Sequence, residues 1–324
     1  MKLASFDVAT ATGTARRVGV YADETDELVD VTATYAQALA DEGEASPQEV
    51  ASTHAPTAMI EFLKRGDRAM DAAERALEYA LETNAENGLD GARLRYDPGE
   101  VTLLSPIPRP NSIRDYMVMA EHVQNVFDEI PDEWYDMPVY YKGDADCVGH
   151  PDQDIPWPNY TEKMDYELEL AAVLGKKGRD IPAEEAEDYI AGYTIYNDLS
   201  ARDIQFEEME VNLGPSKGKD FIGSNVFGPY LVTPDEIDLE SVELTAHVNG
   251  EEWSSGSLGA MQHDFSEIIE HTSQSMYLHP GDVLGSGTVG MGCGLEMDKY
   301  LERGDTIELA AEGIGTLRNT LVDE

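Results

Sequence analysis

The chain has 324 residues, of which 65 are Asp or Glu and only 22 are Lys or Arg, so its formal net charge at pH 7 is −43. A surface field of this sign repels polyanions, which excludes nucleic acids and anionic membranes as partners. Because 41% of the residues are hydrophobic and 16 Tyr, 28 Gly and 16 Pro punctuate the chain, the composition indicates folded protein and excludes a disordered acidic chain.

The first hundred residues predict a small α+β unit. Short alternating runs indicate strands, and two longer runs combine helix-forming residues with apolar positions three or four apart. The expected elements are strands at 2–6 and 16–20 and helices at 57–65 and 67–81. Three prolines then fall between Pro106 and Pro110, and such a run cannot lie inside a helix or a central strand. We therefore predict a domain boundary, with a small N-terminal α+β domain at 1–104 and a second domain at 105–324.

The second domain is expected to be rich in strands with a few covering helices, so the predicted fold class is α+β. Asn249-Gly250 is the strongest short signal for a hairpin turn, and Gly-Asp pairs introduce two further strands. The expected strands are 166–174, 244–248, 282–284 and 306–309, and the expected helices are 115–126, 182–190 and 265–273.

The acidic residues are spread along the whole chain, which we interpret as the composition of a salt-accumulating halophile; the alternative is a merely acidic cytosolic protein. No apolar run approaches the ~20 residues of a membrane span, and the first residues lack the order of a signal peptide. We therefore expect a soluble, cytoplasmic protein. Cys147 and Cys293 are isolated, which predicts neither a disulfide framework nor a zinc site.

Two glutamates form the first candidate site. On a strand, Glu167 and Glu169 project to the same side, about 7 Å apart at Cα, and two carboxylates there repel each other unless solvent or a cation lies between them. A hard divalent ion would supply the compensating charge. The alternative is a solvated strand edge in a very acidic protein.

Asp198 is the second candidate, because it ends the apolar run 190–196 where a buried strand emerges. Arg202 follows four residues later and could hold an anionic substrate through its planar guanidinium. The alternative for Asp198 is a helix N-cap.

Asp115 and His122 are the third candidate. If 114–127 is helical, the two side chains share one face about 10 Å apart along the axis, which suits a metal ligand at one end and a general base at the other. The alternative is a structural or exposed histidine.

The glycine-rich run 285–294 contains a G-x-G-x-x-G pattern, but no amphipathic helix follows it. We interpret it as a loop that brings backbone N–H groups close to a substrate carboxylate or enolate. The segment 214–220 is one residue short of a phosphate-binding loop and ends in Asp220, where Ser or Thr is needed. Both nucleotide-binding interpretations are therefore rejected.

Together these segments resemble the fumarylacetoacetate hydrolase superfamily. The matching stretches, in the family order, are DYELELAAVLGK, GYTIYNDLSARDIQ, LGPSKGKDF, HPGDVLGSGTVG and EGIGTLRN, between about Pro106 and Asn319. The resemblance implies a catalytic domain built as a mixed β-roll or sandwich, usually a homodimer, with a divalent ion beside the substrate. Mg²⁺ is the ion we expect, with Mn²⁺ or Ca²⁺ as alternatives.

Carried over residue by residue, the resemblance also implies roles for individual side chains. The implied metal ligands are Asp115, Glu167, Glu169 and Asp198. His122 is the implied base that activates water, and Glu296 the carboxylate that orients it. Five further residues are implied to hold the substrate's carboxylate and oxo groups or to stabilise the departing carbanion: Tyr141, Arg202, Gln205, Lys219 and Thr288. Lys219 is also counted as catalytic, because it adds a cation.

Three positions depart from the family pattern. Met117 stands where the hydrolase branch has an aromatic substrate contact, and Pro131 stands where a second substrate arginine is expected. In the acylpyruvate hydrolase and oxaloacetate decarboxylase branch, a Glu follows the histidine by three residues, whereas this chain has Asn125.

The leading hypothesis is a metal-dependent enzyme that cleaves the C–C bond of a small 2,4-dioxo acid of the fumarylacetoacetate or acylpyruvate type. The runner-up is a lyase on the same scaffold, which hydrates a 2-oxo-alkenoate or dehydrates a 2-keto-3-deoxy sugar acid. Both reactions need a small 2-oxo acid as the partner of the site, and neither needs nucleic acid or membrane. A non-catalytic protein on an inherited fold is the third hypothesis.

The net charge of −43 predicts that folding depends on salt. Salt shortens the Debye length to about 3 Å at 1 M, so repulsion between surface carboxylates weakens as KCl is added. We expect the melting temperature to rise steeply with KCl. A melting temperature that stays constant between about 0.1 and 3 M KCl, where screening changes several-fold, would contradict the halophilic interpretation.

Overall fold

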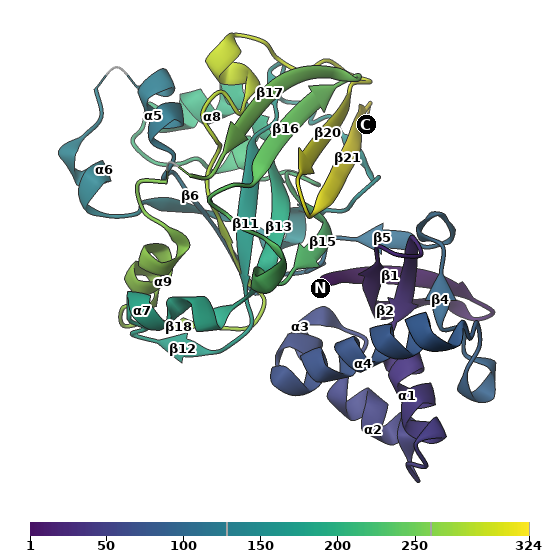
Figure 1. Cartoon of the computed structure of the whole chain (residues 1–324). Coiled ribbons are helices and arrows are strands. Elements are labelled where there is room, and N and C mark those ends of the chain that lie inside the picture. The colour runs from purple at the N-terminus through teal and green to yellow at the C-terminus, as the bar shows by residue number, and fades with distance from the viewer. Residues whose placement is uncertain (128, 260, 324) are drawn as a thin grey trace.

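The computed structural model describes residues 1–127, 129–259 and 261–323 and shows a mixed α+β protein that is rich in strands (Figure 1). Its largest sheet has twelve strands, ten of which follow the order β4-β3-β2-β1-β15-β13-β11-β19-β6-β7, while β5 pairs with β1 and β8 with β15. These strands are β1 (Lys2–Thr10), β2 (Gly13–Ala22), β3 (Glu27–Asp30), β4 (Arg95–Tyr96), β5 (Thr102–Leu104), β6 (Ser112–Tyr116), β7 (Tyr140–Gly143), β8 (Val148–Gly149), β11 (Leu168–Leu174), β13 (Ile190–Asp198), β15 (Asn225–Val232) and β19 (Asp282–Gly285).

A second sheet covers part of the first. Its order is β17-β16-β20-β21-β9, with bounds β9 (Asp154–Pro156), β16 (Glu243–Val248), β17 (Glu251–Ser257), β20 (Thr306–Ala311) and β21 (Gly315–Val322). Strands β16 and β20 lie against β11 and β13 of the large sheet. Their facing leucines and alanines are fully buried in one core, which includes Leu168, Leu170, Leu244, Ala246 and Leu309. The two sheets therefore form a sandwich around the strands that carry the acidic motifs.

Nine α-helices complete the described part of the chain, together with two small two-stranded sheets. The helices are α1 (Val31–Asp41), α2 (Pro47–His54), α3 (Met59–Leu63), α4 (Asp67–Thr83), α5 (Ala120–Val126), α6 (Asp132–Asp136), α7 (Ala183–Ala186), α8 (Arg202–Met209) and α9 (Phe265–Ser273). The small sheets pair β10 (Met164–Asp165) with β14 (Ser200–Ala201), and β12 (Gly178–Arg179) with β18 (Tyr277–Leu278). No helix in the described residues is long and apolar enough to cross a membrane.

The N-terminal helices α1–α4 form a group at one end of the molecule (Figure 1). Helix α4 buries a stripe of alanines three and four residues apart, so it can approach α1 closely. The same core contains Phe227 and Leu231 from β15. Strand β1 pairs with β2 on one side and with β15 on the other, so the large sheet continues across the predicted division at 104/105. That division stays a prediction.

Most of the predicted elements are present. The strands expected at 2–6 and 16–20 lie inside β1 and β2, and the helices expected at 67–81 and 265–273 correspond to α4 and α9. Asn249 and Gly250 have φ values of 53° and 80°, the left-handed turn that the Asn-Gly signal predicts between β16 and β17.

Two helix predictions need correction. The helix expected at 115–126 is wrong in its first half, because residues 112–116 form β6, which lies between β19 and β7 in the large sheet. Pairing on both sides satisfies the backbone of this strand and outweighs its local helical spacing, so the helix begins only at Ala120. The helix expected at 182–190 is reduced to the single turn of α7, followed by a 3₁₀ turn.

Asp30 connects the sheet to the helices of the N-terminal region. It caps α1 by accepting a hydrogen bond from the Ala33 N–H at 2.9 Å, and it pairs with Arg17 at 3.0 Å. The side chain is buried, and burial raises the pKa of Asp30 to about 6, although Ala33 and Arg17 oppose this shift.

The raised pKa of Asp30 predicts a pH dependence of stability. Between about pH 6 and the unfolded value near 4, the folded state binds more protons than the unfolded state, so the stability contributed by Asp30 increases as the pH falls. Asp30→Asn removes this titration but keeps a capping side chain. We expect the melting temperature of the wild type, relative to Asp30→Asn, to rise by several degrees from pH 7 to pH 4.5. A constant difference would show that Asp30 titrates near its ordinary pKa, and a falling difference would show that its pKa is lowered; either result would contradict the prediction.

Candidate metal centre and active site

Four buried carboxylates meet at one end of neighbouring strands. Asp115 lies on β6, Glu169 in β11 with Glu167 just before it, and Asp198 is the last residue of β13. One oxygen of each carboxylate lies within 4.8 Å of the others, and none of the four residues is more than 7% exposed. The structure thus brings together all four residues that the sequence predicts as metal ligands.

Burial makes this cluster electrostatically unfavourable by itself. Burial, and then repulsion from Asp198, raise the pKa of Asp115 well above its ordinary range, and burial and Asp115 do the same for Glu169. Burial raises the pKa of Asp198 to about 6. One oxygen each of Asp115 and Asp198 is buried without any hydrogen-bond partner. Buried acceptors without partners are costly, so these oxygens indicate a missing positive group.

Two buried cations compensate part of the charge. Lys219 Nζ lies 2.6 Å from Glu167 Oε2 and also contacts Asp198, while Arg202 Nη2 lies 2.8 Å from Glu167 Oε1. Burial by itself would raise the pKa of Glu167, but Lys219 and Arg202 outweigh burial and hold that pKa below its ordinary value. Asp115 and Glu169 have no such cation among their described ion pairs.

The four side chains fit a hard divalent cation. All of their donor atoms are carboxylate oxygens. Such oxygens are the preferred ligands of Mg²⁺, Mn²⁺ and Ca²⁺, whereas softer metals prefer sulfur or nitrogen. Two positive charges would balance the carboxylates that Lys219 and Arg202 leave uncompensated. Asp115, Glu167, Glu169 and Asp198 are therefore the residues that would hold the ion.

The glycine-rich loop after β19 contributes directly to this centre. The backbone N–H of Gly287 donates to Glu169 Oε2 at 3.1 Å, and the Thr288 hydroxyl lies 3.4 Å from Glu169 Oε1. A side chain at Gly285 would overlap Asp115 Oδ1, because that carboxylate lies directly over the glycine. The loop and the end of β19 therefore hold two of the candidate ligand side chains in place, and the role of the loop's N–H groups toward the substrate stays a prediction.

His122 lies beside the carboxylates, on α5. Its Nδ1 is 3.2 Å from Glu296 Oε2, within ion-pair distance although not aligned for a linear hydrogen bond. Asn125, one turn later on the same helix, donates to Glu296 Oε1 at 2.8 Å. Burial opposes the ionisation of Glu296, but His122 and Asn125 outweigh it and lower the pKa of this carboxyl. The histidine is thus paired with a carboxylate 174 residues away in the chain, and Asn125 supports that carboxylate.

Asp165 belongs to the candidate site, although its spacing in the sequence gives no prediction for it. It accepts hydrogen bonds from the backbone N–H groups of Gly294 and Leu295, at 2.7 and 3.0 Å, and binds the Arg202 guanidinium at 2.8 Å. It thereby joins the end of the glycine-rich loop to the arginine that holds Glu167. The available signal was its position two residues before Glu167, within the same alternating pattern of carboxylates.

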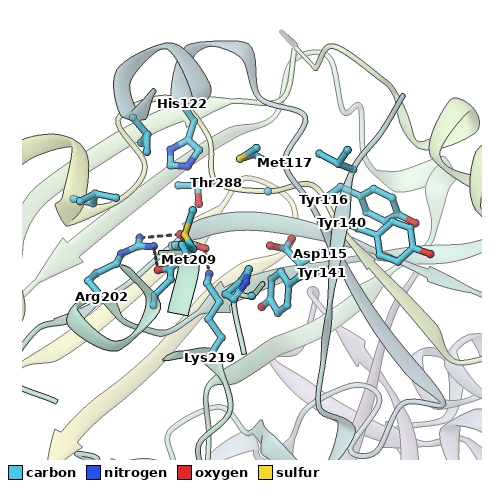
Figure 2. A pocket seen from close by; sticks show the side chains of 18 of the residues that line it. Asp115, Tyr116, Met117, His122, Tyr140, Tyr141, Arg202, Met209, Lys219 and Thr288 are labelled. Carbon is cyan, nitrogen blue, oxygen red and sulfur yellow. Dashed lines mark hydrogen bonds and ion pairs between the residues drawn. The ribbon is translucent and has the colours of Figure 1, made fainter. Parts of the chain in front are cut away.

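The remaining predicted substrate residues also line the cavity above the carboxylates, which measures about 290 Å³ (Figure 2). Tyr141, on β7, donates to Asp198 at 2.6 Å. Gln205 accepts a hydrogen bond from Arg202 at 2.9 Å. The Arg202 side chain is 2% exposed and already bound to Asp165 and Glu167, so its guanidinium holds protein carboxylates as well as facing the cavity.

The family model for the fumarylacetoacetate (FAA) hydrolase C-terminal domain matches residues 112–322. The chain belongs to the fumarylacetoacetate hydrolase family. The matched range contains the four carboxylates, His122 and Glu296, and it begins at β6. The predicted α+β fold, rich in strands, is confirmed, and the candidate site residues all lie within the matched range.

The relatives and solved structures that resemble this chain bear the names of enzymes that catalyse different reactions. The chain is 34% identical over 272 residues to the oxaloacetate tautomerase YisK of Bacillus subtilis, covering 82% of this chain and 87% of that protein. It is 27% identical, with a TM-score of 0.73, to the fumarylacetoacetate hydrolase of the psychrophile Exiguobacterium antarcticum, over 99% of this chain and 100% of that one. A maleylpyruvate hydrolase from Sphingobium sp. SYK-6, solved with manganese(II) and pyruvate, has the same fold at 22% identity, with a TM-score of 0.70 over 100% of this chain and 99% of that one.

The ion pairs predict that Glu167 and Glu169 respond differently to substitution, although the sequence alone treats them as equivalent. We expect Glu169→Gln to keep the shape of the side chain and the fold but to weaken Mn²⁺ binding at least tenfold, since an amide carries no charge. Glu167→Gln should also weaken binding, and it should destabilise the protein by about 3 kcal/mol because Lys219 and Arg202 lose a buried partner.

Calorimetric titration with Mn²⁺ and thermal melting of both variants provide the measurement. Glu184→Gln, an exposed glutamate at the start of α7, is the matched control and should change neither quantity. Unchanged Mn²⁺ affinity of Glu169→Gln would remove the metal assignment.

Proposed function

We propose that this protein is a divalent-metal-dependent hydrolase that cleaves the C–C bond of a small 2,4-dioxo acid, giving a 2-oxo acid and a carboxylic acid. The observation that carries the proposal is the His122–Glu296 pair beside the four-carboxylate cluster, because hydrolysis needs a base for water in addition to a site for the oxo acid. We propose Mg²⁺ as the ion, with Mn²⁺ or Ca²⁺ as alternatives, and a homodimer as the assembly.

The ion, when bound, would act as a Lewis acid for the 2-oxo carboxylate of the substrate. The protein residues then divide the remaining work. Because His122 Nδ1 faces Glu296, its Nε2 is the nitrogen left to take a proton from water. The resulting hydroxide adds to the carbonyl carbon at C4, and the bond between C3 and C4 breaks with its electron pair moving to C3. Protonation of that enolate at C3 completes the 2-oxo acid.

We assign to Lys219 the stabilisation of the enolate. Its ammonium group is buried and contacts Glu167 and Asp198, and these carboxylates outweigh the effect of burial and raise the pKa of Lys219. The lysine therefore stays positively charged beside the site where negative charge develops. Thr288 and the N–H of Gly287 orient Glu169, which Lys219 does not contact in the described ion pairs.

A second candidate is enol–keto tautomerisation of a 2-oxo diacid. The 34% identity to an oxaloacetate tautomerase favours it, and a base paired with a carboxylate can also move a proton between oxygen and carbon. Products separate the two reactions. In an assay with Mg²⁺ and acetylpyruvate, a hydrolase releases pyruvate and acetate in equal amounts. In an assay with Mg²⁺ and oxaloacetate, a tautomerase changes only the enol-to-keto ratio of the substrate.

The base role predicts how substitutions at His122 and Glu296 combine. We expect His122→Ala to lower kcat by roughly 10²–10⁴-fold without changing the affinity for Mg²⁺, because His122 is outside the ligand set. Glu296→Ala should also lower kcat, and the double variant should lose little more than either single variant, because the two residues act as a unit.

The measurements are kcat and melting temperature at saturating Mg²⁺ for the three variants. A stable His122→Ala enzyme with nearly normal turnover would end the hydrolase proposal. A loss of stability that accounts for the lost activity would instead assign a structural role to the histidine.

A further inference from the structure

The cavity has a charged inner end and an apolar outer end. The carboxylates at the inner end are at most 7% exposed. By contrast, several of the other residues that line the cavity are large, apolar and open to solvent: Phe206 is 42% exposed, Met209 38% and Val139 37%. This difference in exposure gives the cavity a direction, from the metal centre outwards to an apolar mouth.

Two separate segments build this mouth. Phe206 and Met209 lie on α8, and Val126, Phe127 and Val139 come from the segment between β6 and β7. In Figure 2, Met209 and Asp115 are drawn around the same cavity, which both residues line. Exposed apolar side chains that converge on a ligand cavity lose contact with water when a ligand covers them, which favours binding of an apolar group.

The described lining offers no unpaired cation for a second carboxylate of the substrate. Arg202 and Lys219 are its only Arg and Lys residues, and both are bound to the carboxylates of the inner end. A carboxylate at the mouth would be desolvated beside Phe206 and Met209 without a partner.

We infer that the substrate is a monocarboxylic 2-oxo acid whose distal end, beyond the reacting carbons, is an uncharged apolar chain or ring held by Phe206, Met209 and Val139. This inference rests on the proposed binding of a 2-oxo acid at the carboxylate cluster. It specifies which class of 2-oxo acid binds there. It assigns to α8 the selection of the substrate tail, and it disfavours dicarboxylic substrates.

A matched pair of ligands tests the inference by binding, independently of turnover. 2-Oxohexanoate and 2-oxoadipate have the same carbon chain and differ only in a terminal methyl or carboxylate. Calorimetric titration of the Mn²⁺-loaded protein in molar KCl should show 2-oxohexanoate binding at least tenfold more tightly than 2-oxoadipate. 2-Oxohexanoate should also bind more tightly than pyruvate, by about fourfold for each added methylene that is buried.

Substitution of Met209 links this preference to the mouth. Met209→Arg places a cation there and should reduce or reverse the preference for 2-oxohexanoate at least tenfold, whereas the control Met209→Leu should keep it. Equal or tighter binding of 2-oxoadipate by the wild type, with pyruvate still bound, would overturn the inference alone. Binding of Mn²⁺ without binding of any 2-oxo acid, pyruvate included, would overturn the proposed function and this inference with it.

Discussion

The repulsion among buried carboxylates is the constraint on which the rest of the catalytic region depends. Four acids from three strands lie within 4.8 Å of one another, and Asp165 adds a fifth just beyond them. Such a cluster is stable only if positive groups are built around it. Lys219 and Arg202 supply two, and each is fixed by more than one carboxylate, so the charges form a network rather than separate pairs.

This network explains why the surrounding residues are arranged as they are. Gly285 has no side chain because Asp115 occupies the space where a Cβ would lie. Asp165 binds both Arg202 and the loop that carries Glu296. Because Arg202 also contacts Glu167, the position of the His122–Glu296 pair is coupled to the position of Glu167. The carboxylate cluster and the His122 side of the cavity are therefore connected by contacts within the protein itself. These contacts do not depend on a bound substrate or ion.

Much of the site could be predicted from the sequence because the evidence is local. The alternation of Glu167 and Glu169 and the place of Asp198 at the end of an apolar run need only the geometry of a strand. The part that failed depends on distant pairing. The seven-residue spacing of Asp115 and His122 predicts one helix for both residues, but β19 and β7 pair with the segment of Asp115 from elsewhere in the chain. The importance of Asp165 depends on contacts with Gly294 and Arg202, which spacing along the chain cannot show.

The candidate metal ligands and the proposed base are held by different kinds of structure. Asp115, Glu169 and Asp198 are anchored in the large sheet, whereas His122 lies on α5, which has only seven residues and no side-chain cap at its start. Short helices of this kind depend on neighbouring contacts, since they are marginal on their own. On gradual warming, we therefore expect the histidine side of the cavity to loosen first, so that a reaction that needs His122 would stop at temperatures where the carboxylates could still hold an ion.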